Sequence, residues 1–139
     1  MNEIPVVHIR QTRMITVKLA GASWGWLYDN TSWGALEQDT QLDKDARAAV
    51  LAADRRKVGK GRIFTASMPD EQAESVWGIL NSIAGVGESM TTEERGDAVY
   101  TFRAMRRDAG RIQESLEAIG WELSPKGYFT VSASPEESK

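Results

Sequence analysis

Four aromatic residues with hydrogen-bonding side chains cluster in one short stretch, SWGWLYDNTSWGAL, at residues 23–36. They are Trp24, Trp26, Tyr28 and Trp33. Exposed tryptophan and tyrosine rings anchor protein partners, and they can also provide a platform on which a nucleic-acid base stacks. The competing interpretation is that the stretch belongs to the core. We predict that these four residues form a partner-binding surface.

The motif Trp-Gly-x-Leu occurs three times, beginning at Trp24, Trp33 and Trp77. We expect the glycine to let another backbone approach closely, and the leucine to lie on the same helical face as the tryptophan. Trp77 is predicted to be core, because Val76 and Leu80 mark a buried helix face around it.

Arginines form the second candidate site. Arg103, Arg107 and Arg111 stand four residues apart, so a helix would place them on one face, where like charges repel. Neighbouring acids such as Asp108 could offset this repulsion, and so could a bound phosphate. The alternative function is therefore nucleic-acid or nucleotide binding, with a tryptophan stacking on a base. Its candidate residues are Arg103, Arg106, Arg107, Arg111, Arg55 and Arg56.

The sequence gives little support for catalysis or metal binding. The chain has no cysteine and one histidine, His8, so thiolate metal sites and Ser-His-Asp catalysis are not indicated. The acids Asp39, Asp43 and Asp45 could form only an all-carboxylate metal site, and their place at a helix start already explains them. We predict no metal, no cofactor and no enzymatic activity.

The amino-acid composition indicates an ordinary globular protein. The 139 residues are 41% hydrophobic and 27% charged, with a net charge of −3, which is typical of one globular domain. We expect a single compact domain over residues 1–133 and a mobile polar tail over 134–139. The sequence has no apolar run long enough to span a membrane and no signal-peptide pattern, so we expect a cytoplasmic protein.

Several elements must position these candidates. Alternation predicts a strand over 12–20, and a further strand is predicted over 62–66. Helices are predicted over 43–57, with bases in the last turn, and from a cap at Ser67, with Pro69 in the first turn, to about Ala84. A capping box at Thr91 and Glu94 opens a long helix to Ile119, and a last strand follows a turn at 124–127. The segment 22–38 is left as either an aromatic loop or a helix.

These elements predict an α+β fold in which three to four helices pack on one face of a sheet of about three strands. Two units, each ending in an Arg-Arg pair, suggest a degenerate internal duplication. The apolar seam of the long helix could also support a homodimer, if the sheet leaves it uncovered. The predicted core is Ile15, Val17, Leu19, Val50, Leu51, Ile63, Phe64, Val76, Trp77, Leu80, Phe102, Met105, Ile112, Leu116, Phe129 and Val131.

The sequence thus predicts a non-catalytic protein-interaction module, such as a small adaptor, inhibitor or regulatory accessory protein. It would bind another protein through its exposed aromatic residues. Membrane association is not expected.

Overall fold

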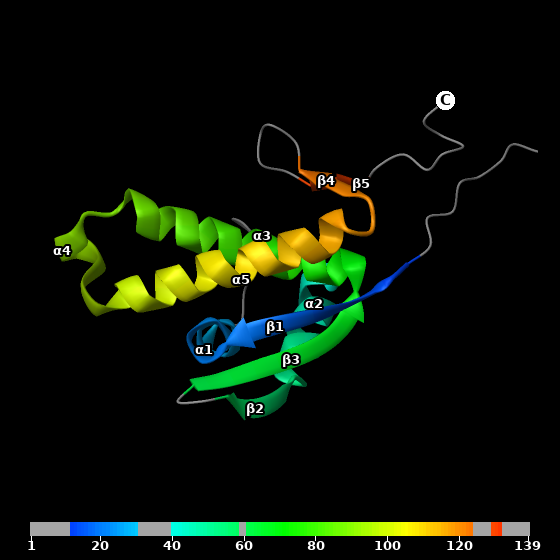
Figure 1. Cartoon of the computed structure of the whole chain (residues 1–139), viewed down its shortest axis with the longest axis horizontal. Coiled ribbons are helices and arrows are strands. Elements are labelled where there is room, and N and C mark those ends of the chain that lie inside the picture. Colours follow the sequence, from blue (N-terminus) through cyan, green and yellow to red (C-terminus); the bar gives the residue numbers. More distant parts are fainter. Residues whose placement is uncertain (1–11, 31–39, 59–60, 124–128, 132–139) are drawn as a thin grey trace, which may run out of the picture.

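The computed structural model describes residues 12–30, 40–58, 61–123 and 129–131. Its elements run in the following order along the chain (Figure 1). They are β1 (Met14–Ala20), α1 (Gly21–Asp29), α2 (Gln41–Leu51), β2 (Asp54–Val58), β3 (Gly61–Pro69), α3 (Asp70–Ser89), α4 (Thr92–Arg95), the short 3-10 helix η1 (Gly96–Ala98), α5 (Val99–Glu117), β4 (Trp121–Leu123) and β5 (Phe129–Val131).

An antiparallel sheet in the order β1-β3-β2 forms the base of the fold. The register pairs Ile15 with Met68 and Leu19 with Phe64, so these apolar side chains share one face of the sheet. All four are buried, whereas Lys18 is exposed on the opposite face. The alternation that the sequence shows over 14–19 therefore marks which face is covered.

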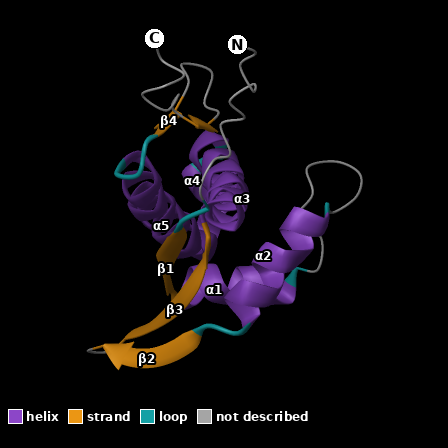
Figure 2. Ribbon diagram, turned by 90° about the vertical axis from the view of Figure 1, so that its right-hand side faces the viewer, coloured by secondary structure: helices purple, strands orange, loops and turns teal. Residues whose placement is uncertain are grey.

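Helices cover that one face. The pair α3 and α5 lies side by side above β1, and α4 joins the two at one end (Figure 1). The pair α1 and α2 lies beside the sheet when the molecule is turned (Figure 2). A single apolar core connects both pairs to the sheet, from Leu27 in α1 and Val50 in α2 to Leu80 in α3 and Met105 in α5. The predicted α+β class, with helices on one face of a three-stranded sheet, is confirmed.

The third strand of this sheet differs from the one predicted. The helix expected over 43–57 ends at Leu51, and the basic residues that follow form the edge strand β2, which pairs with β3. Bases are favourable at a helix end, but here β3 offers a free edge whose backbone groups β2 satisfies, and pairing overrides the local pattern. The expected last strand instead forms a separate two-stranded sheet of β4 and β5.

The predicted long helix is divided. Thr91 and Glu94 form the expected capping box, but it caps only the short helix α4. Gly96 then takes a positive φ of 49°, which an ordinary side chain rarely adopts, and the chain turns before α5 begins at Val99. The sequence signal for a helix start was correct, and the glycine five residues later was the signal for the break.

Most of the predicted core is buried, including Trp77, which is only 4% exposed. Leu51, Ile63 and Phe102 are half-buried. The side chains of Phe129 and Val131 lie outside the described residues. Core members that the prediction missed are Leu27, Ala46, Ala66, Met68, Ala73, Ala84, Ala104, Ala109 and Trp121.

The seam of the long helix is used within the chain. Met105, Ala109, Ile112 and Leu116 are buried in the same core as α3 and β1. The condition for pairing this seam with a second copy was that it stay uncovered, and that condition is not met. The two Arg-Arg pairs that a duplication would align also lie in different kinds of element, strand β2 and helix α5.

None of the helices in the described part of the chain is long and apolar enough to cross a membrane.

Candidate functional site

The aromatic stretch begins as a helix, so the helical alternative is correct for its first half. Trp24 lies in α1 between two other rings, with its centroid 4.2 Å from that of Phe64 and 5.0 Å from that of Tyr28. Its indole Nε1 donates a hydrogen bond of 2.9 Å to the backbone oxygen of Val50. Trp24 therefore ties α1 to β3 and to the end of α2, with its polar atom already used.

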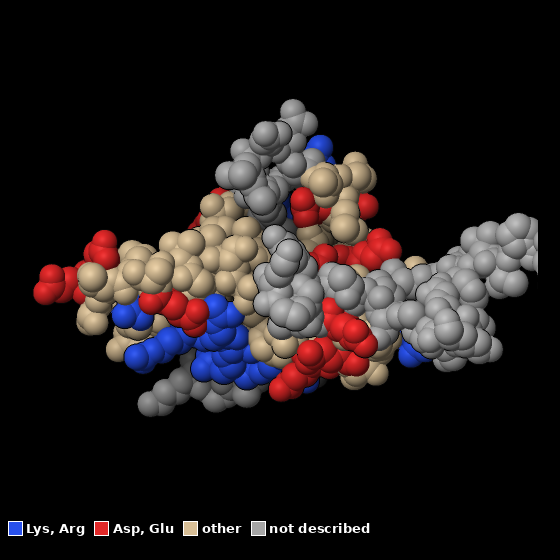
Figure 3. Space-filling view, turned by 90° about the horizontal axis from the view of Figure 1, so that it is seen from above, with Lys and Arg blue, Asp and Glu red and all other residues tan. Residues whose placement is uncertain are grey.

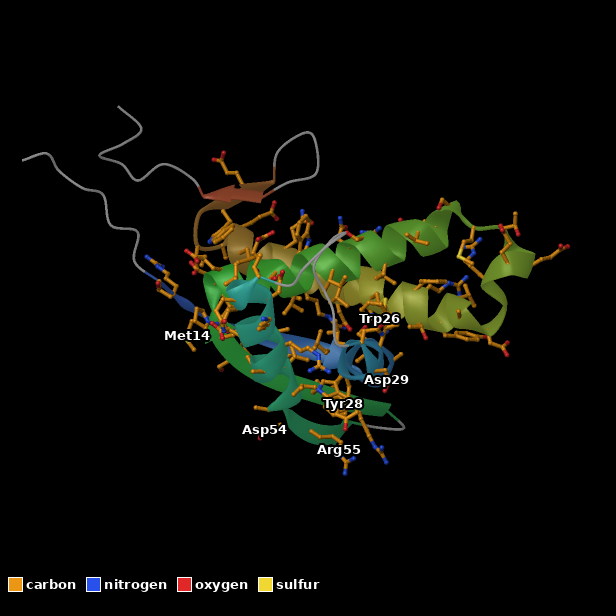
Figure 4. All side chains as sticks on the ribbon, turned by 180° about the vertical axis from the view of Figure 1, so that it is seen from behind. Met14, Trp26, Tyr28, Asp29, Asp54 and Arg55 are labelled. Atoms are coloured by element: carbon orange, nitrogen blue, oxygen red, sulfur yellow. The ribbon has the colours of Figure 1, made fainter. Side chains whose placement is uncertain are left out.

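The neighbouring aromatic residues point in different directions. Figure 4 places Trp26 toward the α3 and α5 side of α1 and Tyr28 toward β2, near Arg55. Trp26 packs against the core as a partly buried side chain, and Tyr28 is 53% exposed. The predicted partner-binding residues therefore do not form one patch, because those that the structure describes point to two different sides of α1. Trp33 lies outside the described residues.

The two Trp-Gly-x-Leu copies that the structure describes, at Trp24 and Trp77, do not use their glycines as we expected; the copy at Trp33 lies outside the described residues. A Cβ added at Gly25 would meet nothing within 4 Å, and one at Gly78 would meet only a Glu74 side-chain oxygen at 4.0 Å. Among the described residues, no backbone atom of another element lies within 4 Å of a Cβ placed at either glycine. The leucines do behave as predicted, since Leu27 and Leu80 are fully buried.

Three of the predicted arginines come together at a pocket. It has a volume of about 220 Å³ and lies where the end of α3, α4 and the start of α5 meet. Arg103, Arg106 and Arg107 contribute to its wall. The remaining lining residues are Gly87, Glu88, Arg95, Val99 and Phe102. Seen from above, Lys and Arg side chains gather in one patch beside the helix pair (Figure 3).

Arg106 is held by an ion pair across the two helices. Its Nε and Nη2 donate to the two carboxylate oxygens of Glu88 at 2.8 and 2.6 Å, and its Nη1 donates to Asn81. These hydrogen bonds, together with the charges of Arg106 and Arg95, lower the pKa of Glu88. Glu88 thus stays ionised and fixes the Arg106 guanidinium at the pocket wall.

Arg95 is a pocket residue that the sequence reasoning missed. Its Nε is buried and has no hydrogen-bond partner among the described residues. Arg103 and Arg107 are exposed and form no salt bridge within the described part of the chain. The sequence signal that could have identified Arg95 is the glycine at position 96, because the turn at Gly96 ends α4 and leads the chain into α5.

The other predicted anion-binding residues lie elsewhere. Arg111 donates to the Asp108 carboxylate at 3.4 Å, and Asp108 also accepts the backbone N–H of Ala20 at 2.9 Å. Burial raises the pKa of Asp108, against the lowering effects of Ala20, Ser23, Arg111 and Arg107. The expected acidic neighbour is therefore present for Arg111. Arg55 lies on the edge strand, and the Arg56 side chain lies outside the described residues.

One pair of acids converges from distant positions. Asp43 in α2 accepts a hydrogen bond from Ser75 in α3, and Glu74 lies nearby with a pKa raised by burial and by the Asp43 charge. Asp43 also completes the cap of α2 with Thr40. In the described ranges no group of three acids or histidines is placed to hold a metal ion.

The protein is thus a small α+β protein with an arginine-lined pocket at one end of the α3 and α5 pair. The chain is 26% identical over 106 residues to a protein of Corynebacterium kroppenstedtii named 3-isopropylmalate dehydratase small subunit. The match covers 73% of this chain and 53% of that protein, so the chain spans about half the length of its relative. No family model matches the chain, and no solved structure matches it.

This similarity corrects the predicted function. We predicted a stand-alone adaptor, inhibitor or regulatory module that binds through its aromatic residues, and that prediction is wrong. The relative bears the name of a subunit of an enzyme. The same finding counts against the alternative of a nucleic-acid or nucleotide binder.

Proposed function

We propose that this chain is a subunit of an enzyme complex. The observation that carries the proposal is its similarity over most of its length to a protein named as the small subunit of a dehydratase. Because about half of that relative has no counterpart in this chain, we propose the class of assembly, a multi-subunit enzyme, and take dehydration as the activity to test.

The end of the α3 and α5 pair is the surface that we propose for the partner subunit. Val86, in the last turn of α3, is 55% exposed, and Tyr100, in the first turn of α5, is 70% exposed. Gly87 follows Val86, Phe102 stands two residues after Tyr100, and Gly87 and Phe102 touch across the two helices. Val86 and Tyr100 therefore lie at the same end of the pair. Large apolar side chains left in water favour burial against another protein.

We also propose that catalysis belongs to another subunit. The deeply buried carboxylates of the described residues have structural bonds: Asp108 accepts from the backbone of Ala20, and Asp70 accepts from the indole of Trp121 at 3.3 Å. An acid used in this way is less available for proton transfer to a substrate. We place the assembly in the cytoplasm, in keeping with the absence of cysteine from the sequence.

The proposal is tested by purifying the tagged full-length chain from the cells that make it and measuring the mass of what elutes with it. We expect a stable complex with a fixed stoichiometry that contains an enzyme subunit, and we expect removal of the chain to lower that enzyme's activity. The first activity to assay is dehydration of 3-isopropylmalate.

A matched pair of variants tests the surface. Tyr100→Asp should abolish complex formation, whereas Met14→Asp should leave it unchanged, because Met14 is 64% exposed on β1, away from this end of the molecule. Elution of the wild-type chain by itself under every condition would show that the proposal is wrong.

A further inference from the structure

A row of side chains on α5 brings positive charge to the pocket at the end of the helix pair. Val99, Arg103 and Arg107 stand four residues apart, so they follow one another along the pocket wall. Arg103 and Arg107 are exposed and form no salt bridge with a described residue, and like charges at this spacing repel each other. An acidic group brought to this row would relieve the repulsion.

Apolar surface surrounds the two arginines. Inside the pocket the wall is made by Val99 and Phe102, both half-buried, beside the backbone of Gly87. Outside it, Val86 is 55% exposed and Tyr100 is 70% exposed. A cavity of roughly 150 Å³ holds a benzene ring, so the pocket, at about 220 Å³, accommodates one large apolar side chain.

Charge and exposure together restrict what covers this end of the molecule. A small anion would pair with the arginines but leave Val86 and Tyr100 in water. A second copy of the chain, packed by two-fold symmetry, would place arginine against arginine. An acidic segment of another protein that carries a large apolar side chain meets both requirements, because opposite charges across an interface favour association and arginine is enriched in interfaces.

We infer that the partner subunit inserts a large apolar side chain into this pocket and pairs aspartate or glutamate carboxylates beside it with Arg103 and Arg107. A guanidinium group is suited to two parallel hydrogen bonds with a carboxylate. Arg106 is already held by Glu88 and Asn81, so its part is to keep that side of the pocket in place before the partner arrives. The contact rests on the proposed function and adds to it the chemistry that the partner must present.

A lysine placed in the row identifies the group that faces it. Residues 70–117 contain no lysine, so Arg103→Lys or Arg107→Lys keeps the positive charge and provides the single lysine of α3, α4 and α5. Each tagged variant is purified with its partner and treated with a water-soluble carbodiimide, which joins an amine to a carboxylate in direct contact. We expect peptide mass spectrometry to find each lysine joined to an aspartate or glutamate of the partner, with a large apolar residue within about four positions of that acid.

Two control variants accompany this experiment. Arg62→Lys places an amine at an exposed position on β3, and it should give no link to the partner. Arg106→Lys places an amine opposite Glu88, and it should be joined to Glu88 within the chain, which shows that the reagent reaches the pocket.

The affinity of the chain for the partner recovered from the wild-type complex tests the same contact. Arg103→Gln and Arg107→Gln should each raise the Kd about tenfold or more, as is usual when a charged hydrogen bond is lost, and added salt should slow association. Arg62→Gln removes the same charge from β3 and should leave the Kd within about twofold, as expected for a distant exposed charge. All three arginines are exposed, and two-dimensional amide spectra check that the variants are folded.

The outcomes distinguish this contact from the proposed function. If the wild-type chain co-purifies with no partner, the proposed function is wrong and the contact is wrong with it. If the complex forms but the lysines at 103 and 107 are joined only to carboxylates of this chain, or to none while the lysine at 106 is joined to Glu88, only the contact is wrong. Binding of both glutamine variants with the wild-type Kd would refute the contact in the same way.

Discussion

Gly85 and Gly87 stand two residues apart in α3, and we expect alanine at these positions to have opposite effects on stability. A Cβ at Gly85 would meet nothing within 4 Å. A Cβ at Gly87 would lie 2.2 Å from Cγ of Phe102 and 2.5 Å from both Cδ atoms, because the ring packs flat on the glycine backbone. Gly87 is buried, so the clash can be relieved only if the Phe102 ring or one of the two helices moves.

The magnitudes follow from two opposing terms. Alanine is better than glycine inside a helix by about 0.5–1 kcal/mol, because it loses less backbone entropy on folding. At Gly85 nothing opposes this gain. At Gly87 overpacking costs about 1–3 kcal/mol, because Phe102 must leave its position or α5 must move away from α3. The helix gain is common to both variants, so they should differ by the overpacking cost, roughly 1–3 kcal/mol in the free energy of unfolding.

Urea denaturation of wild type, Gly85→Ala and Gly87→Ala measures both effects. We expect the midpoint to rise for Gly85→Ala and to fall for Gly87→Ala, with the m-value unchanged. The double variant Gly87→Ala with Phe102→Ala should lose the clash and show a coupling between the two sites. If Gly87→Ala proves as stable as Gly85→Ala, then the close packing of α3 on α5 at this point is refuted.

Two more predictions concern Asp108 and Trp24. Asp108→Asn keeps an oxygen to accept from the Ala20 N–H, so it should cost less than Asp108→Ala, for which we expect a loss of about 1–3 kcal/mol. Because folding raises the pKa of Asp108, the folded wild type binds more protons than the unfolded chain. Its stability relative to Asp108→Asn should therefore fall as pH rises from the usual aspartate pKa through the raised one. Urea titrations at about pH 4 and about pH 7 measure this difference, and a relative stability that increases with pH would contradict the prediction. Trp24→Phe keeps a ring against Phe64 but loses the bond to Val50, so it should destabilise by about 1 kcal/mol, against about 3 kcal/mol for Trp24→Ala. Denaturant titrations compare the two, and equal losses would show that the stacking of the ring contributes nothing.

Much of the fold could be predicted from periodicity, because burial on one face imposes it. The strand around Val17 and the helix faces around Leu80 and Met105 show their apolar spacing in the sequence and are buried as expected. The strand β2 could not be predicted in this way. Four of its five residues, Asp54 to Lys57, are charged and resemble a helix end, and only the edge that β3 offers decides their conformation.

The candidate site was predictable only in part. The spacing of Arg103 and Arg107 correctly placed them on one helix face, and the interpretation of Asp108 as an acidic neighbour was correct for Arg111. Arg95 was missed because its position depends on the turn at Gly96, a tertiary feature with one glycine as its only signal. The paired acids Asp43 and Glu74 come from different helices, and local spacing carries no information about them.

The edge strand β2 has a consequence for how copies of the chain behave in concentrated solution. In the order β1-β3-β2, one side of β2 pairs with β3, and no described strand pairs with its other side. An unpaired edge can template the growth of a continuous intermolecular sheet, and charged residues on the edge oppose this. Asp54 is followed by Arg55, Arg56 and Lys57, so two copies that met edge to edge would bring cations close together. The basic run that suggested a ligand thus favours solubility, and exchanging it for uncharged β-formers would shorten the time to precipitation more than it would change the midpoint of unfolding.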